Sequence, residues 1–250
     1  MLDYIIQNAT ICTGLNEKAK VGDIGIQGDK IVELTEPAEA KHVIDGEGMI
    51  LSPGFIDPHA STGFGYFFPH AADHKLYQGI TTEIFGNCGT SPAPIGPHLE
   101  ETMQGLSESI GFPYDWNTTS EYFDRISDKL QFNIATLVGH STLRGGRMDD
   151  WKSLKSSQLT EMEADLEQAL KEGAIGFSTG LIYAPGCFAE MEEIISLAKV
   201  TAEAGGIYAS HIRDERNNVE EAIDEALTIS EKANVRTLIS HLKAAEKQNW

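Results

Sequence analysis

The sequence is poor in positive charge. Its 250 residues include 19 lysines and arginines but 38 aspartates and glutamates, which gives a formal net charge of −19 at pH 7. A surface with this excess of negative charge repels the phosphate backbone of nucleic acids. The composition therefore argues against a nucleic-acid partner.

The sequence also lacks long apolar runs and a cysteine framework. No stretch reaches the roughly 18 apolar residues of a membrane span. The start, Met1-Leu-Asp-Tyr4, has neither the basic flank nor the long apolar region of a signal peptide. The three cysteines, Cys12, Cys88 and Cys187, cannot all pair, and their spacing matches no disulfide scaffold. We expect a cytoplasmic protein with reduced thiols and no membrane association.

The apolar residues follow two different patterns along the chain. Residues 1–52 form short segments rich in Ile, Val and Tyr, with a hairpin turn predicted at Gln27-Gly-Asp-Lys30. They predict a small, β-sandwich-like N-terminal domain. From Pro53 onward, apolar strands alternate with longer segments of helical period, which is typical of βα units around a parallel sheet. Residues 53–250 are therefore predicted to form a second domain, a (β/α) barrel.

The second domain is predicted to be an incomplete barrel. Strands are expected to begin near residues 54, 81, 134, 174, 207 and 236, and helices over 99–110, 119–130, 158–172, 189–204 and 219–233. A TIM-type (β/α)8 barrel has eight such units. The prediction is thus an α/β fold with about six of eight barrel units present, incomplete at the C-terminus.

Side chains that can bind a metal follow several of these strands. Cys88 comes after the strand near 81, His211 and His241 end the last two strands, and His59 and His140 follow two others. The C-terminal ends of parallel barrel strands converge on one face. Cysteine and histidine are suitable zinc ligands, and a catalytic zinc has three protein ligands and a position for water. A single buried cysteine or histidine is usually structural, so the matched positions favour a metal site.

The sequence motifs around these strand ends are specific. The relevant motifs are Pro53-Gly-Phe-Ile-Asp-Pro-His59, Gly86-Asn-Cys-Gly89, Ser178-Thr-Gly-Leu-Ile-Tyr183, Ser210-His-Ile-Arg-Asp-Glu215 and Ser240-His-Leu-Lys243. Together they closely resemble the N-acyl-D-amino-acid deacylases, D-aminoacylase-type members of the amidohydrolase superfamily of metal-dependent hydrolases. The resemblance covers nearly the whole chain.

The resemblance implies a site and a reaction. Cys88, His211 and His241 would hold one tightly bound Zn²⁺. Lys243 would grip the substrate carboxylate, Tyr183 would line the pocket, and His140 would belong to its wall or lie just behind it. The enzyme would hydrolyse the amide of a small N-acyl-D-amino acid to a carboxylic acid and a D-amino acid. The oligomeric state is not indicated.

Two departures from the family pattern bear on activity. The family carries His-x-His followed two residues later by Asp, whereas this chain reads His59-Ala-Ser61-Thr-Gly63. A second metal held through His59 should therefore be lost or weakened, because serine is a poor zinc ligand and glycine has no side chain. The family's general-base aspartate is expected beyond residue 250, so this chain alone is expected to be inactive.

Other interpretations remain open at this point. A cyclic-amide hydrolase of the hydantoinase or dihydroorotase kind would commonly carry a carboxylated lysine on the fourth strand, and residues 174–180 contain no lysine. A zinc-binding relic or fragment without catalysis is the other alternative. Arg213 is expected to pair with the adjacent acidic run Asp214-Glu215.

Overall fold

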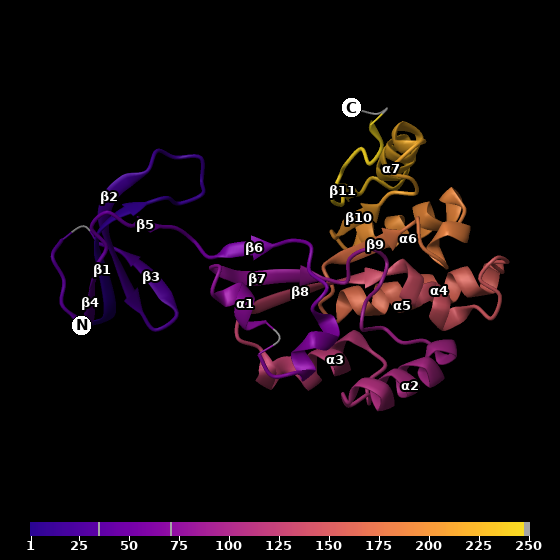
Figure 1. The fold of residues 1–250 in the computed structure, drawn as a ribbon, viewed down its shortest axis with the longest axis horizontal. Coiled ribbons are helices and arrows are strands. Elements are labelled where there is room, and N and C mark those ends of the chain that lie inside the picture. The colour runs from indigo at the N-terminus through magenta and orange to yellow at the C-terminus, as the bar shows by residue number, and fades with distance from the viewer. Residues whose placement is uncertain (35, 71, 248–250) are drawn as a thin grey trace. The chain divides into compact units, whose positions relative to one another are not determined.

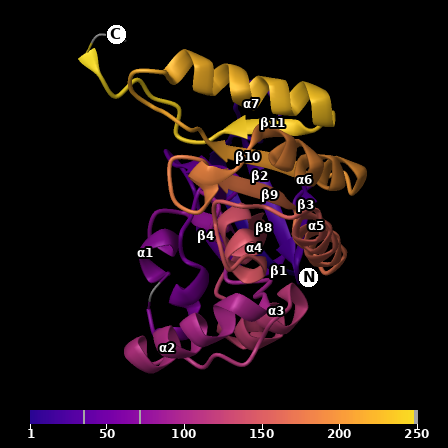
Figure 2. The same cartoon turned by 90° about the vertical axis from the view of Figure 1, so that its right-hand side faces the viewer.

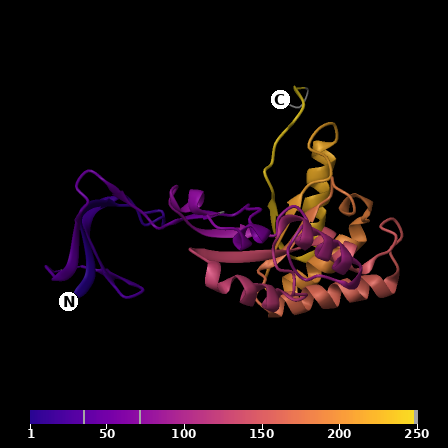
Figure 3. The same ribbon diagram turned by 60° about the horizontal axis from the view of Figure 1, so that its bottom comes forward.

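The computed structural model describes residues 1–34, 36–70 and 72–247, and it divides into two compact units, Met1–Phe55 and Ile56–Trp250. The first unit is a small sheet in the order β3-β2-β1-β4, with β5 also paired to β1 (Figure 3, indigo). Its strands are β1 (Leu2–Ile11), β2 (Lys20–Gln27), β3 (Lys30–Glu33), β4 (Ala40–Asp45) and β5 (Ile50–Leu51).

The hairpin expected between the second and third strands is confirmed. Gln27 pairs with Lys30, so Gly28 and Asp29 form a two-residue turn. Gly28 has φ +58°, which glycine adopts without the penalty of a side chain.

The second unit is built on six strands whose order in the sheet follows their order in the chain (Figure 1). Pairing is parallel from β7 through β11. The strands are β6 (Phe55–Asp57), β7 (Ile80–Phe85), β8 (Asn133–Gly139), β9 (Gly176–Gly180), β10 (Ile207–His211) and β11 (Arg236–Ile239). This confirms the predicted α/β class, a partial (β/α) barrel with a separate small β unit. Among the described residues, β6 and β11 are the open edges of the sheet.

Helices connect the strands in the βα manner expected from the sequence. α5, α6 and α7 lie side by side along the sheet (Figure 2). The helices are α1 (Asp73–Leu76), α2 (Glu100–Ile110), α3 (Thr119–Ile126), α4 (His140–Arg147), α5 (Ser156–Lys171), α6 (Met191–Glu203) and α7 (Val219–Ala233), with 3-10 turns η1 (Gly63–Phe67), η2 (Pro97–Leu99), η3 (Ser127–Lys129) and η4 (Gly186–Phe188). No helix among the described residues is long and apolar enough to cross a bilayer.

Two details differ from the sequence-based expectation. α3 ends at Ile126 instead of residue 130, because the chain tightens into η3. α4 was not predicted, since Gly145 and Gly146 interrupt its pattern. Gly146 is needed there because a Cβ on it would lie 2.8 Å from the Gly96 backbone.

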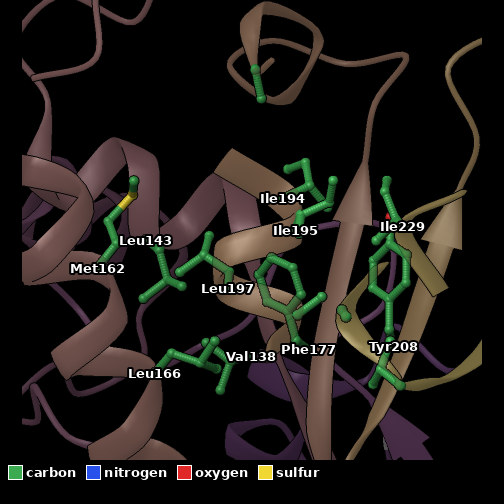
Figure 4. Packing of buried hydrophobic residues seen from close by; sticks show 14 of the residues in the cluster. Val138, Leu143, Met162, Leu166, Phe177, Ile194, Ile195, Leu197, Tyr208 and Ile229 are labelled. Atoms are coloured by element: carbon green, nitrogen blue, oxygen red, sulfur yellow. The ribbon is translucent and has the colours of Figure 1, made fainter. Parts of the chain in front are cut away.

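The main core fills the space between the sheet and these helices (Figure 4). Phe177 of β9 and Tyr208 of β10 stack with their ring centroids 5.8 Å apart. Leu166 of α5 and Leu197 of α6 pack in the same cluster and are fully buried. Burial of each such side chain is worth about 1.5–3 kcal/mol, so the core fixes the strands and, with them, the positions of the strand ends.

Candidate metal centre

Four side chains with metal-binding atoms meet at the C-terminal ends of the strands. Cys88 follows β7, and His59 follows β6 by two residues. His211 is the last residue of β10, and His241 comes two residues after β11. Since β7 to β11 are parallel, Cys88, His211 and His241 lie at the same end, as the sequence pattern indicates. His59 lies there too, because it contacts Cys88.

The turn that carries Cys88 is backbone-restricted. Gly86 has φ +80°, and a Cβ there would lie 2.0 Å from the Leu137 carbonyl oxygen, so only glycine fits. Cys88 itself has φ +53° and His241 has φ +34°, which are uncommon values for residues with side chains. Left-handed non-glycine residues cluster at functional sites. Both of these left-handed residues belong to the same donor group, with Cys88 Sγ 3.6 Å from His241 Nε2.

Three of the four side chains form one compact donor group. The Cys88 Sγ atom lies 3.3 Å from His59 Nε2 and 3.6 Å from His241 Nε2. All three donor atoms are within 4.8 Å of one another. Asp57 accepts a hydrogen bond from the His59 backbone N–H at 3.1 Å and so fixes the turn that presents this histidine.

His211 lies on the other side of His241. Their ring centroids are 4.4 Å apart, and the Tyr183 ring packs edge-on against His211 at 4.8 Å. Both ring nitrogens of His211 are buried and make no hydrogen bond to any described residue. Buried polar atoms without a partner are rare and call for an explanation such as a bound ion.

Glu215 is a member of the centre that the sequence pattern did not identify. Its Oε1 lies 3.0 Å from His241 Nδ1 and 3.7 Å from His211 Nε2, and it accepts a short hydrogen bond from Lys243. Glu215, His211 and His241 therefore form a second donor group within 4.8 Å. The expected pairing of Arg213 with the acidic run is wrong, because its guanidinium binds Glu225 at 2.8 Å. Glu215 lies in the loop between β10 and α7, where no sequence spacing indicates its contact with His241.

The protonation states suit metal binding by the histidines. Burial is the main cause that lowers the pKa of His59 and of His211, so both are neutral at pH 7 and offer a lone pair. Burial, followed by the charge of Glu215, raises the pKa of the Cys88 thiol. Burial opposes ionisation of Glu215, but the hydrogen bond from Lys243 and the nearby charges outweigh it and lower its pKa.

The donor spacing can be compared with the geometry of zinc. Tetrahedral bonds of about 2.3 Å to sulfur and 2.05 Å to nitrogen place the two donors about 3.6 Å apart. The Cys88–His241 distance of 3.6 Å and the Cys88–His59 distance of 3.3 Å are close to this value. The chemistry and spacing of the donors therefore fit a zinc ion.

Comparison with protein families decides the relationship. The sequence profile of the Amidohydrolase family matches residues 42–249. The chain belongs to the amidohydrolase family. This amidohydrolase is 36% identical to the N-acyl-D-glutamate deacylase of Alcaligenes xylosoxydans xylosoxydans over 255 aligned residues, covering 100% of this chain and 51% of the relative. The chain thus spans about half the length of the curated relatives it matches.

Solved structures agree with this relationship. The N-acyl-D-glutamate deacylase of Bordetella bronchiseptica, complexed with zinc and a phosphonate that mimics the tetrahedral intermediate, matches with TM-score 0.91 and 35% identity over 100% of this chain and 53% of that chain. A D-aminoacylase structure also matches, with TM-score 0.89 and 32% identity over 100% of this chain and 53% of that chain. It describes a binuclear metal centre with one-metal activation and second-metal attenuation. The similarity to N-acyl-D-amino-acid deacylases inferred from the motifs is confirmed.

A cavity of about 350 Å³ adjoins the Cys88 side of the amidohydrolase centre. Ser61 and Gly63, the positions that depart from the family pattern, line it together with Phe64, Phe85 and Tyr183, and no lining residue is charged. The Ser141 hydroxyl in its wall is buried and has no hydrogen-bond partner among the described residues. The space beside Cys88 therefore offers small hydroxyl and aromatic groups.

The remaining predicted site residues lie at different depths in the amidohydrolase. Tyr183 is 51% exposed and reaches both His211 and the cavity. The Lys243 side chain is half exposed and faces Glu215. His140 is fully buried, bonds Glu193 at 2.7 Å and is not among the residues that line the cavity.

Proposed function

We propose that this amidohydrolase is part of a zinc-dependent enzyme that hydrolyses N-acyl-D-amino acids to a carboxylic acid and a D-amino acid. The observation that carries the proposal is the convergence of Cys88, His59, His211 and His241 at the ends of parallel strands. The deacylases named above, which align with the whole chain, support the choice of substrate class.

We assign the tightly bound zinc to Cys88, His211 and His241. Cys88 and His241 face each other at a zinc-compatible distance. His59 lies 3.3 Å from Cys88, whereas His211 shares a donor group with His241 and Glu215 and not with Cys88. His211 nevertheless has two buried nitrogens without hydrogen-bond partners among the described residues, which a metal ion would satisfy. We therefore place His59 as a flanking donor.

The chain's own groups would bind and orient the substrate. A zinc ion in such a site lowers the pKa of bound water and polarises the substrate carbonyl. Lys243 would bind the substrate carboxylate, and Tyr183 would form the wall between that carboxylate and the cavity. Glu215 is already held by His241 and Lys243, so we place the general base on an aspartate outside residues 1–250.

We further propose that one metal ion suffices. The cavity offers Ser61 and Gly63 where the family pattern has histidine and aspartate. A hydroxyl and a bare backbone are weak substitutes for those ligands. In the D-aminoacylase described above, a second metal attenuates activity; here excess zinc should attenuate activity much less.

The competing hypotheses receive less support. A cyclic-amide hydrolase with a carboxylated lysine has no lysine on β9 (Gly176–Gly180) to build on. A cytoplasmic location accords with three free cysteines, none of which is disulfide-bonded. An inactive zinc-binding relic makes the same metal prediction and is separated only by an activity assay.

The test is release of free amino acid from a panel of N-acyl-D- and N-acyl-L-amino acids. We would assay the 250-residue chain alone and a hybrid in which the C-terminal half of the Bordetella bronchiseptica relative follows residue 250. We expect D-selective, zinc-dependent turnover by the hybrid and none by the chain alone. The matched control is the hybrid with Cys88→Ala. A folded, zinc-loaded hybrid without turnover, or a Cys88→Ala hybrid as active as its parent, would contradict the proposal.

A further inference from the structure

Glu215 contacts the segment after β11 at three points. Its carboxylate lies 3.0 Å from His241 Nδ1 and accepts the short hydrogen bond from Lys243. Its backbone carbonyl accepts a hydrogen bond from the Ala245 N–H at 2.9 Å. Residues 242–245, in the yellow chain of Figure 3, lie outside the helices and strands.

The contact with His241 decides which ring nitrogen is available. The Glu215 carboxylate at 3.0 Å and the Lys243 ammonium at 3.4 Å both face Nδ1 of His241. The carboxylate is nearer and can only accept a proton, so we take Nδ1 as the protonated nitrogen. The lone pair is then on Nε2, the atom that lies 3.6 Å from Cys88 Sγ. The contact with Glu215 thus leaves the basic nitrogen of His241 facing the cysteine.

The rings of His59 and His211 and the Cys88 thiol also contact His241, but Glu215 makes the nearest polar contact with its Nδ1. The His241 side chain is about one-third exposed, and its backbone has the uncommon φ of +34°. A partly exposed ring can rotate unless a hydrogen bond fixes it, and carboxylates that bind the second nitrogen of a ligating histidine fix both its tautomer and its orientation.

We propose that Glu215 is a positioning residue that fixes His241 for zinc through Nδ1 and holds Lys243 beside the same site. The inference rests on the proposed zinc centre. Glu215 is not itself a ligand of that zinc. Its carboxylate lies 3.0 Å from Nδ1 of His241, whereas Cys88 lies 3.6 Å from Nε2, so Glu215 does not share a donor group with Cys88.

The experiment is zinc affinity of the 250-residue chain, measured by competition with a chelator of known affinity. Glu215→Ala should weaken zinc binding by about 10- to 100-fold, the usual effect of removing such a partner. Glu215→Gln keeps an oxygen that can accept the Nδ1 hydrogen and should stay within about threefold of wild type. Lys243→Met removes the other polar contact of Nδ1, at 3.4 Å, and should also leave zinc affinity nearly unchanged, because an ammonium cannot accept the Nδ1 proton. Glu220→Ala, which removes an exposed acid from the first turn of α7, controls for charge.

Each outcome bears on the proposal. Circular dichroism of each variant would show that it is folded. A wild-type affinity in Glu215→Ala overturns the proposal while leaving the zinc site intact. Loss of zinc in Glu215→Gln equal to that in Glu215→Ala would make Glu215 a direct ligand and also overturns it. A wild-type chain that binds no zinc would overturn both this inference and the proposed function, whereas zinc binding without deacylase activity in the hybrid would overturn only the latter.

Discussion

Replacement of Glu193 by glutamine should strongly destabilise the second unit. Glu193 lies in α6 and is only 3% exposed. Its carboxylate accepts hydrogen bonds from Arg144 Nε at 2.7 Å and Nη2 at 2.9 Å, and from His140 Nε2 at 2.7 Å. Arg144 is 1% exposed, so the substitution leaves a buried guanidinium without its counter-charge.

The size of the effect follows from that uncompensated charge. Removing one partner of a buried ion pair costs about 3–5 kcal/mol, a large part of the 5–15 kcal/mol that typically separates folded from unfolded domains. At about 2–4 °C per kcal/mol for a chain of this size, the melting temperature should fall by roughly 6–20 °C. Glutamine has nearly the shape of glutamate, so cavity formation adds little.

Urea unfolding followed by tryptophan fluorescence would measure this change. All three tryptophans lie in the second unit, so the signal reports on it alone. The matched control is Glu167→Gln, which breaks an exposed pair with Lys171 at 2.7 Å and should cost about 0.5 kcal/mol or less. A loss below about 1 kcal/mol for Glu193→Gln would refute the reasoning.

Two further predictions concern pH and substrate. Burial lowers the pKa of His140, and the bonds from His140 and Arg144 outweigh burial to lower the pKa of Glu193. The stability that His140 and Glu193 contribute is complete above their unfolded pKa values of about 6.5 and 4.3. It is lost as pH falls through the folded values. The urea concentration at the unfolding midpoint should therefore decrease when the pH is lowered below 6.5, and more steeply below 4.3. A midpoint that rises on acidification would contradict this. In the active hybrid, Lys243→Met should raise KM about tenfold or more with kcat little changed, while Lys232→Met at the exposed end of α7 should not; an unaltered KM for Lys243→Met would exclude the carboxylate contact.

The sequence predicted the parts of the molecule that follow from local patterns. The six strands and the tip positions of Cys88, His211 and His241 follow from apolar segments that end in metal-binding residues. Glu215 was missed as a partner of the centre because its position depends on the loop after β10, which brings it back to His241. No periodic pattern in the sequence predicts that this loop brings Glu215 to His241.

Close packing explains the other differences. α4 is short and contains Gly145 and Gly146, which have low helix propensity. They are needed because they lie close to Leu99 and Gly96. The cavity beside Ser61 exists because η1 places Gly63 and Phe64 around it. Both features arise from contacts between segments far apart in the chain.

The zinc content of the purified 250-residue chain tests the central claim most directly. Wild type should carry about one zinc per chain, and Cys88→Ala should lose most of it, because the thiolate is the strongest ligand in the proposed set. Cys187→Ala, which removes a free cysteine outside both donor groups, should keep the wild-type content. Equal zinc in wild type and Cys88→Ala would contradict the proposed metal centre.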